Sequence, residues 1–190
     1  MKIQSKILND AYLDYLRNKY ESRIPYSYYG EDKFKPFFGS LFEINDMVYV
    51  TQISHSQDRH IKLKQNIDFY KIYHPDDGRL ISVINLNYMF PIHKSLLIDL
   101  KYKDIDKHRT FISDKAKSKY IDLLNIELKI INELPITENA IKIYDNKYKY
   151  PDNNVSKRSF DFKKLEQACL EYQVLEEINE AQEQVASDKE

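Results

Sequence analysis

The sequence has no tryptophan, a single cysteine and only three glycines among its 190 residues. One cysteine cannot form a disulfide framework within the chain, which excludes the small disulfide-rich secreted folds. No apolar run approaches the roughly 20 residues that a membrane-spanning helix needs, and Met1–Ser5 lacks the apolar segment of a signal peptide. We therefore expect a cytoplasmic protein without a membrane partner.

Sequence motifs for metals and cofactors are missing as well. The five histidines do not fall into an H-E-x-x-H pattern or a Cys/His zinc pattern, and no glycine-rich phosphate loop is present. Cys169 lies within a helical apolar stripe with Leu165, Ala168, Tyr172 and Leu175, which is more typical of a core position than of a nucleophile. The sequence predicts neither a bound metal nor a cofactor.

The net charge of −1 hides an uneven distribution. From Asp161 onward nine acidic residues oppose three lysines, a net charge of −6, so the preceding 160 residues carry about +5. A basic body with an acidic tail permits an RNA-binding groove. The 16 tyrosines could stack on bases, although for any single one a packing role is the more common use.

The first half of the chain alternates between strand and turn signals. Asn9 predicts the N-cap of a short helix over Asp10–Tyr20. The next signals predict a β-hairpin with arms at Phe37–Ile44 and Met47–Ile53, followed by a polar loop at Ser54–His60. Strand structure is expected within Ile61–Tyr73, and a turn at Pro75–Gly78. A strand at Leu80–Leu86 that breaks near Pro91 and a last strand at Leu96–Leu100 complete the pattern.

Helical periodicity replaces this pattern after Ile105. It predicts helices over Asp114–Leu134, Ile136–Tyr148 and Asp161 to about Gln184, with a loop at Pro151–Asn154 and fraying of the last few residues. No flexible linker separates the two halves. We predict an α+β fold in one domain, residues 1–190, with a mostly antiparallel β-core and helices added largely from the C-terminal half.

The richest polar cluster is the segment Ser54–His60, which follows a predicted strand. Metal-free RNA cleavage needs a base for the 2′-hydroxyl proton, an acid for the leaving 5′-oxygen and donors for the charged phosphate. The segment offers suitable side chains in Ser54, His55, Ser56, Arg59 and His60. Polar loops between strands are common, however, so composition alone leaves this segment a solvated loop.

Three further stretches indicate a family. They are Lys35–Gly39 running into Leu41–Ile44, the asparagine-containing Ile84–Ile92 with Met89-Phe90-Pro91, and the helix entrance Phe160–Tyr172. In this order and spacing, over nearly the whole chain, they resemble the ToxN/AbiQ family of type III toxin–antitoxin endoribonucleases. The short helix before Ile24-Pro25 is similar to that family as well.

The resemblance implies an SH3-like β-barrel core, as in the Kid/MazF toxins, with added helices. It implies metal-independent RNA cleavage that leaves a 2′,3′-cyclic phosphate, and defence against phage by abortive infection. The implied partners are cellular and phage RNA substrates and a small repeat RNA antitoxin. The toxin cuts the repeat RNA, and its pseudoknot units then block the active site in a toxin–RNA hetero-oligomer.

The family's active segment reads Thr-Ser-x-Lys after an apolar strand, and the corresponding residues of this sequence match it only in part. Ser54 takes the threonine place, His55 the serine place and Gln57 the lysine place, unless a small gap aligns Ser56 with the family serine. Lys35 matches the upstream basic position.

The family's loop tyrosine has two candidates, Tyr29 and Tyr28. The predicted catalytic residues are therefore Lys35, Ser54, His55 and Tyr29. The predicted RNA-binding residues are Tyr28, Ser56, Gln57, Arg59 and His60.

Two other hypotheses stay open. The absence of the family lysine at Gln57 suits a catalytically silent RNA-binding protein of the same fold. The acidic C-terminal helix would also suit an unrelated interaction domain that binds a protein partner.

Overall fold

The computed structural model describes residues 2–30 and 33–187, with side chains described as far as Glu180. An eight-stranded antiparallel sheet forms its centre, in the order β5-β6-β4-β2-β1-β8, with β3 and β7 also paired to β4. The strands are β1 (Gln4–Leu8), β2 (Phe37–Gly39), β3 (Glu43–Ile44), β4 (Met47–His55), β5 (Phe69–Tyr73), β6 (Leu80–Asn85), β7 (Phe90–His93) and β8 (Leu97–Asp99).

The helices are α1 (Asp10–Lys19), α2 (Asp58–Lys62), α3 (Asp114–Glu133), α4 (Ile136–Lys149), α5 (Asn154–Arg158) and α6 (Phe162–Ser187), with 3-10 turns η1 (Leu86–Tyr88), η2 (Lys94–Leu96) and η3 (Tyr102–Lys107). Most helical residues follow the last strand, so the mixed fold predicted from the sequence is confirmed in its coarse form. Among the described residues, no helix combines the length and the apolar character that crossing a bilayer requires.

Strand β4 organises the sheet because it pairs with four others. Its first residues pair with β3 and β7, Thr51 and Gln52 pair with β2, and Ile53–His55 pair with β6. Asn45 makes the turn into β4 with φ +54°, a left-handed conformation that asparagine tolerates better than most residues. The second half of β4 is thus held first by β2 and then by β6, which gives its last side chains fixed directions.

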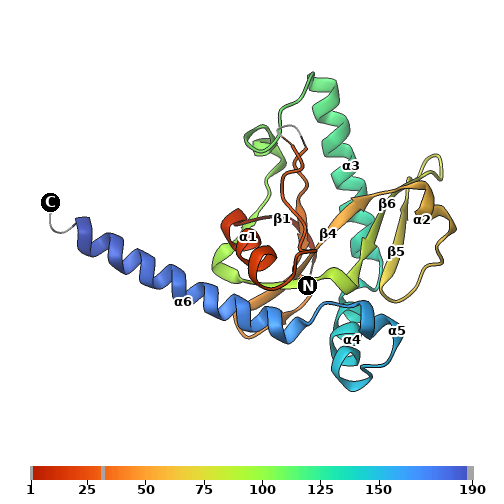
Figure 1. Cartoon of the computed structure of the whole chain (residues 1–190). Coiled ribbons are helices and arrows are strands. Elements are labelled where there is room, and N and C mark those ends of the chain that lie inside the picture. Colours follow the sequence, from red (N-terminus) through yellow and green to blue (C-terminus); the bar gives the residue numbers. More distant parts are fainter. Residues whose placement is uncertain (1, 31–32, 188–190) are drawn as a thin grey trace.

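Helix packing follows the predicted patterns. Asn9 caps α1 by accepting a hydrogen bond from the Tyr12 backbone N–H at 3.1 Å. In α6, the predicted stripe is buried at Leu165, Ala168, Cys169 and Tyr172. The first half of α6 packs against β7 and α1, whereas its second half extends away from the body (Figure 1). Leu175, predicted on the same stripe, is exposed there, and the predicted fraying at residues 188–190 lies outside the described residues.

Several local predictions are wrong. Strand β1 was not expected, and the first arm of the hairpin is interrupted between β2 and β3. The segment Ser54–His60 is not a loop, because β4 continues to His55 and α2 starts at Asp58. The predicted strand structure within Ile61–Tyr73, by contrast, is confirmed by β5.

The strand that starts at Leu80 does break, but at the η1 turn rather than at Pro91, which lies inside β7 and faces Tyr49 across the ladder. Strand β7 pairs only with β4 in the described sheet, so a residue without an N–H is tolerated at this edge. The predicted loop Pro151–Asn154 leads into the short helix α5, which was not expected.

Candidate functional site

The loop between α1 and β2 is tied to β4 by one glutamine. The Gln52 amide donates hydrogen bonds to the backbone carbonyls of Tyr26 (2.8 Å) and Lys35 (3.2 Å). Its oxygen accepts a hydrogen bond from the Tyr29 hydroxyl at 3.0 Å. Three contacts from one side chain therefore set the positions of Tyr29 and Lys35 relative to β4.

A groove of about 330 Å³ lies along this loop and the adjacent face of β4. We call it the Ser54 groove, and it is lined by Ser22, Arg23, Ile24, Pro25, Tyr26, Tyr29, Thr51, Gln52, Ser54, Asn85 and Tyr88. Ser54 and Gln52 are two residues apart on β4 and so project to the same side of the strand. The groove thus brings together two predicted catalytic residues, Ser54 and Tyr29, with hydroxyl and amide groups suited to a phosphate or sugar.

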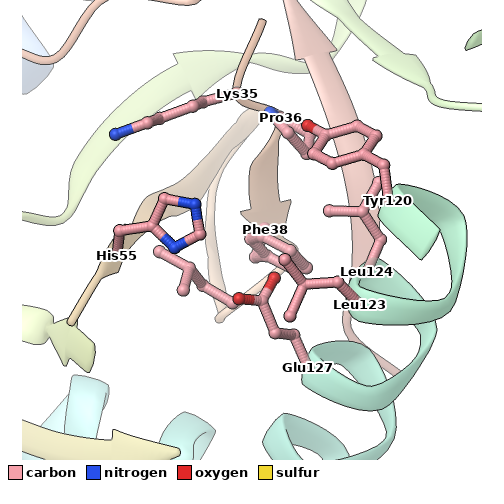
Figure 2. A pocket seen from close by; sticks show the side chains of 9 residues that line it. Lys35, Pro36, Phe38, His55, Tyr120, Leu123, Leu124 and Glu127 are labelled. Carbon is pink, nitrogen blue, oxygen red and sulfur yellow. The ribbon is translucent and has the colours of Figure 1, made fainter. Parts of the chain in front are cut away.

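A second, smaller pocket of about 40 Å³, the Glu127 pocket, lies between β4 and α3. It is lined by Lys35, Pro36, Phe38, Ile53, His55, Tyr120, Leu123, Leu124 and Glu127. Figure 2 shows the Lys35 and His55 side chains on one wall and the Glu127 carboxyl rising from α3 on the other. Its volume suits one or two water molecules rather than a nucleotide.

Glu127 is the residue that the sequence reasoning missed. Its side chain is only 5% exposed, and its Oε1 accepts a hydrogen bond from the Ser82 hydroxyl at 2.6 Å. Burial raises the pKa of this carboxyl to about 7, although the Ser82 hydrogen bond and the nearby Lys35 charge both act in the opposite direction. The available signal was an acidic residue inside the apolar stripe of a helix. A carboxyl that titrates near neutrality can exchange protons at working pH.

Lys35 connects the two cavities. It lines the Glu127 pocket, and its ammonium lies 4.5 Å from the centroid of the Tyr29 ring, which belongs to the Ser54 groove. Burial lowers the pKa of Lys35, while the negative charge of Glu127 opposes that shift. Tyr120 of α3 donates a hydrogen bond to the Phe34 carbonyl at 2.8 Å, which fixes the backbone just before Lys35.

Ser54 and His55 are adjacent on β4 and so face opposite sides of the strand. Ser54 lines the Ser54 groove, whereas His55 lines the Glu127 pocket beside Lys35. The four predicted catalytic residues therefore form two pairs, Tyr29 with Ser54 and Lys35 with His55. The Lys35 side chain reaches from the second pair to the first.

Two of the predicted RNA-binding residues are engaged in the fold. The Ser56 hydroxyl donates a hydrogen bond to the Leu80 carbonyl at 2.9 Å. His60 is buried, and its Nδ1 accepts a hydrogen bond from the Gln57 backbone N–H at 3.1 Å, which steadies the start of α2. Burial lowers the pKa of His60 and so favours the neutral ring that can accept.

The other predicted RNA-binding residues are more open. Gln57, just before α2, and Arg59, on α2, are exposed, although Arg59 Nε donates a hydrogen bond to His60 Nε2 at 3.3 Å. The Tyr28 hydroxyl lies 3.2 Å from His108 Nδ1, and this residue lines neither cavity. Between the two candidates for the family's loop tyrosine, the structure therefore favours Tyr29. Among the described residues, His, Cys, Asp and Glu side chains form no group of three suited to a metal ion.

The Ser54 groove also contains residues that the sequence analysis did not single out. The Arg23 guanidinium lies 5.5 Å from the centroid of the Tyr88 ring, and both side chains line the groove. Arg23 carries the positive charge on this wall and forms an ion pair with Glu21 at 2.8 Å. Its position in an irregular loop gave no periodic signal, so only the folded loop reveals it.

Comparisons with known proteins agree on one family. The sequence model described as "Toxin ToxN, type III toxin-antitoxin system" matches residues 5–170. One similar solved structure is a toxin of a bacterial type III toxin–antitoxin system that is selectively inhibited by a non-coding RNA pseudoknot. It is 21% identical, with a TM-score of 0.73, over 91% of this chain and 99% of that chain.

A second similar structure is AbiQ, a lactococcal anti-phage endoribonuclease of a type III toxin–antitoxin system. It is 23% identical, with a TM-score of 0.70, over 91% of this chain and 99% of that chain. A third comes from a bacterial antiviral system regulated by a processed non-coding RNA, at 18% identity and a TM-score of 0.65, over 88% of this chain and 96% of that chain. At these identities the structural likeness shows the shared fold. A comparison with curated protein sequences gives no significant match.

Proposed function

The chain belongs to the ToxN family of type III toxin–antitoxin systems, and on this premise we propose that it is a metal-independent endoribonuclease toxin. It cleaves RNA by attack of the 2′-hydroxyl on the adjacent phosphate and leaves a 2′,3′-cyclic phosphate. It processes a repeat RNA antitoxin that then inhibits it in a toxin–RNA assembly, and it acts in abortive infection. The AbiQ likeness supports the ribonuclease activity, and the likeness to the pseudoknot-inhibited toxin supports the RNA partner.

One observation carries the proposal: the Lys35 ammonium lies over the Tyr29 ring at the edge of the groove that holds Ser54. The hydroxyl groups of Ser54 and Tyr29 thus line one groove, and the Lys35 ammonium lies next to it, 4.5 Å from the centroid of the Tyr29 ring. In the reaction the 2′-oxygen bonds to phosphorus while the bond to the 5′-oxygen breaks. The 2′-hydroxyl loses its proton to a general base, and the leaving 5′-oxygen gains one from a general acid or from water. Lys35, Ser54 and Tyr29 are the groups that stabilise the extra negative charge on the phosphorane.

The base that removes the 2′-hydroxyl proton is Lys35 or His55 in this proposal. Burial lowers the pKa of Lys35, which increases its neutral fraction and so its capacity to accept a proton. His55 stands beside Lys35 in the Glu127 pocket, on the opposite side of β4 from Ser54. We propose Lys35 as the group nearer to the RNA, because its ammonium lies beside the Tyr29 ring of the Ser54 groove, and His55 as a partner that exchanges protons with Lys35.

The finer structural predictions belong to the same proposal. We propose that residues 1–190 form one domain, with support from a single buried cluster that extends from Ile3 of the N-terminal segment to Tyr172 of α6. The SH3-like core remains a proposal, supported by the pairing of β4 with strands at both of its ends. A cytoplasmic location is proposed because the RNA substrates and the RNA antitoxin are found there.

The proposal is tested by incubating the purified chain with RNA in EDTA and mapping the new ends. We expect discrete cuts that carry 2′,3′-cyclic phosphates. Substitution of Lys35, Ser54 or His55 by alanine is expected to lower cleavage by about a hundredfold or more for a charge-stabilising group, with folding retained. Lys119→Ala is the matched control, because Lys119 is exposed on α3. Unchanged cleavage in all three site variants would refute the site.

A catalytically silent RNA-binding protein is the second candidate, and a specific residue favours it. Gln57 takes the place of the family's active-segment lysine in the ungapped match, and this side chain is exposed at the start of α2. An amide carries no charge and takes up no proton near neutral pH, so it cannot replace a lysine in acid–base chemistry. Retained binding of RNA without any cleavage, in EDTA or in Mg²⁺, is the result that this candidate predicts.

A further inference from the structure

A third cavity, of about 310 Å³, lies next to the Ser54 groove, and we call it the Asn87 pocket. The two cavities share Asn85 and Tyr88 as lining residues, so they are neighbours along the end of β6 and the η1 turn. Its volume is at the lower end of the range of about 300–1,000 Å³ for small-molecule sites. A strand of RNA in the Ser54 groove could therefore place one base in the Asn87 pocket.

Asn87 supplies a polar group without a protein partner. Its side chain is 2% exposed, and its Oδ1 has no hydrogen-bond partner among the described residues. The backbone around it is fixed, because its carbonyl accepts a hydrogen bond from the Phe160 N–H at 3.0 Å. Buried acceptors are usually paired, so an orphaned one next to a cavity indicates a ligand that donates to it.

The walls of the Asn87 pocket combine fixed charge with flat surfaces. Asp68 is buried, and both of its oxygens accept hydrogen bonds from the Arg158 guanidinium at 2.6 Å. This bidentate pair holds the guanidinium plane in place while about half of the Arg158 side chain stays exposed. The Tyr88 ring is 36% exposed at the boundary with the Ser54 groove. Unstacked RNA bases stack on guanidinium planes and on tyrosine rings.

We propose that the Asn87 pocket binds one nucleobase of the RNA strand held in the Ser54 groove, and that it selects adenine or cytosine, the bases whose exocyclic amino group adjoins an unprotonated ring nitrogen on the Watson–Crick edge. The amino group donates to Asn87 Oδ1, and the adjacent ring nitrogen accepts from the Asn87 amide. Uracil has no amino group and leaves Oδ1 unpaired. This inference rests on the proposed RNA substrate and assigns it a specificity pocket.

The test measures binding, so that it does not depend on cleavage. Octamers with 2′-O-methyl ribose lack the attacking hydroxyl and cannot be cut. Affinities are compared for two pairs: adenosine against purine riboside, and cytidine against its 4-deamino analogue. Each pair differs only in the amino group. We expect at least one pair to differ by about tenfold for wild type, because a base contact of this kind discriminates to that degree.

Asn87→Ala is expected to reduce that ratio to near one, whereas Asn125→Ala, at an exposed asparagine of α3, is expected to keep it. Asn87→Leu, whose side chain is of similar size, replaces the alanine variant in this test if Asn87→Ala unfolds. The inference is overturned if wild type shows no discrimination in either pair, or if both Asn87 variants retain it. Cleavage measured in parallel reports on the proposed function separately: amine-dependent binding without cleavage overturns only the enzymatic proposal, and cleavage without amine dependence overturns only the base pocket.

Discussion

Glu127→Gln is the most informative substitution in the candidate site. Glutamine has the same shape as a protonated glutamate, and its oxygen can still accept the hydrogen bond from Ser82. The change therefore removes only the ability of this position to ionise. It separates the effect of the buried charge from the effect of packing around α3.

The expected effect on stability follows from the pKa of Glu127, which burial raises from 4.5 to about 7. Below pH 4.5 the carboxyl is protonated in both the folded and the unfolded chain, so its ionisation does not affect stability. Between pH 4.5 and 7 the unfolded chain ionises first, and the free energy of unfolding falls by about 1.4 kcal/mol per pH unit. Above pH 7 wild type bears the whole penalty, about 3 kcal/mol, and Glu127→Gln does not.

Urea unfolding of both proteins at pH 5, 6, 7 and 8 measures this difference. We expect Glu127→Gln to be within about 1 kcal/mol of wild type at pH 5 and about 3 kcal/mol more stable at pH 8. Glu133→Gln, at an exposed glutamate near the end of the same helix, is the control and should show no such trend. A constant difference across the pH series, or a less stable variant at pH 8, would refute the assignment of a buried carboxyl with a raised pKa.

Two further predictions concern the groups that hold the cavities in shape. Gln52→Ala removes all three contacts between β4 and the preceding loop, so we expect cleavage to fall by at least about tenfold as Tyr29 and Lys35 lose their positions. The measurement is kcat under conditions where circular dichroism shows a folded chain, and an unchanged kcat would contradict the positioning role of Gln52. Arg158→Ala leaves the buried Asp68 carboxylate without its partner. Because Arg158 is partly exposed, we expect the free energy of unfolding to fall by about 2 kcal/mol rather than by the 3–5 kcal/mol of a fully buried pair. An unfolding free energy equal to that of wild type would count against this prediction.

The elements that could be predicted are those with a local signal. Asn9 and the periodic Tyr12, Leu13 and Leu16 define α1, and Asn45 defines the turn before β4. Strand β1 was missed because Gln4–Leu8 carries mixed polar residues, and its pairing partners β2 and β8 are distant in the sequence. Helix α2 has five residues, too few for a period to appear.

In the candidate site, too, only the residues with a signal in the sequence could be predicted. Lys35 and Ser54 were predicted from their places in the family pattern. The position of the Lys35 ammonium beside the Tyr29 ring depends on the Gln52 contacts, which only the folded loop provides. Glu127 and Asn87 gave weak signals for a common reason. A polar residue becomes informative when it is known to be buried, and burial is a property of the tertiary structure.

The position of Lys35 between the Ser54 groove and the Glu127 pocket has a thermodynamic consequence. A phosphate bound in the groove adds negative charge close to Lys35 and offsets the attraction that now lowers the pKa of Glu127. The carboxyl then holds its proton more tightly, so RNA binding is accompanied by proton uptake. Linkage is reciprocal, so if RNA occupies the proposed site we expect it to bind more tightly as the pH falls through 7. The chain would sense acidity through a side chain that the RNA does not touch.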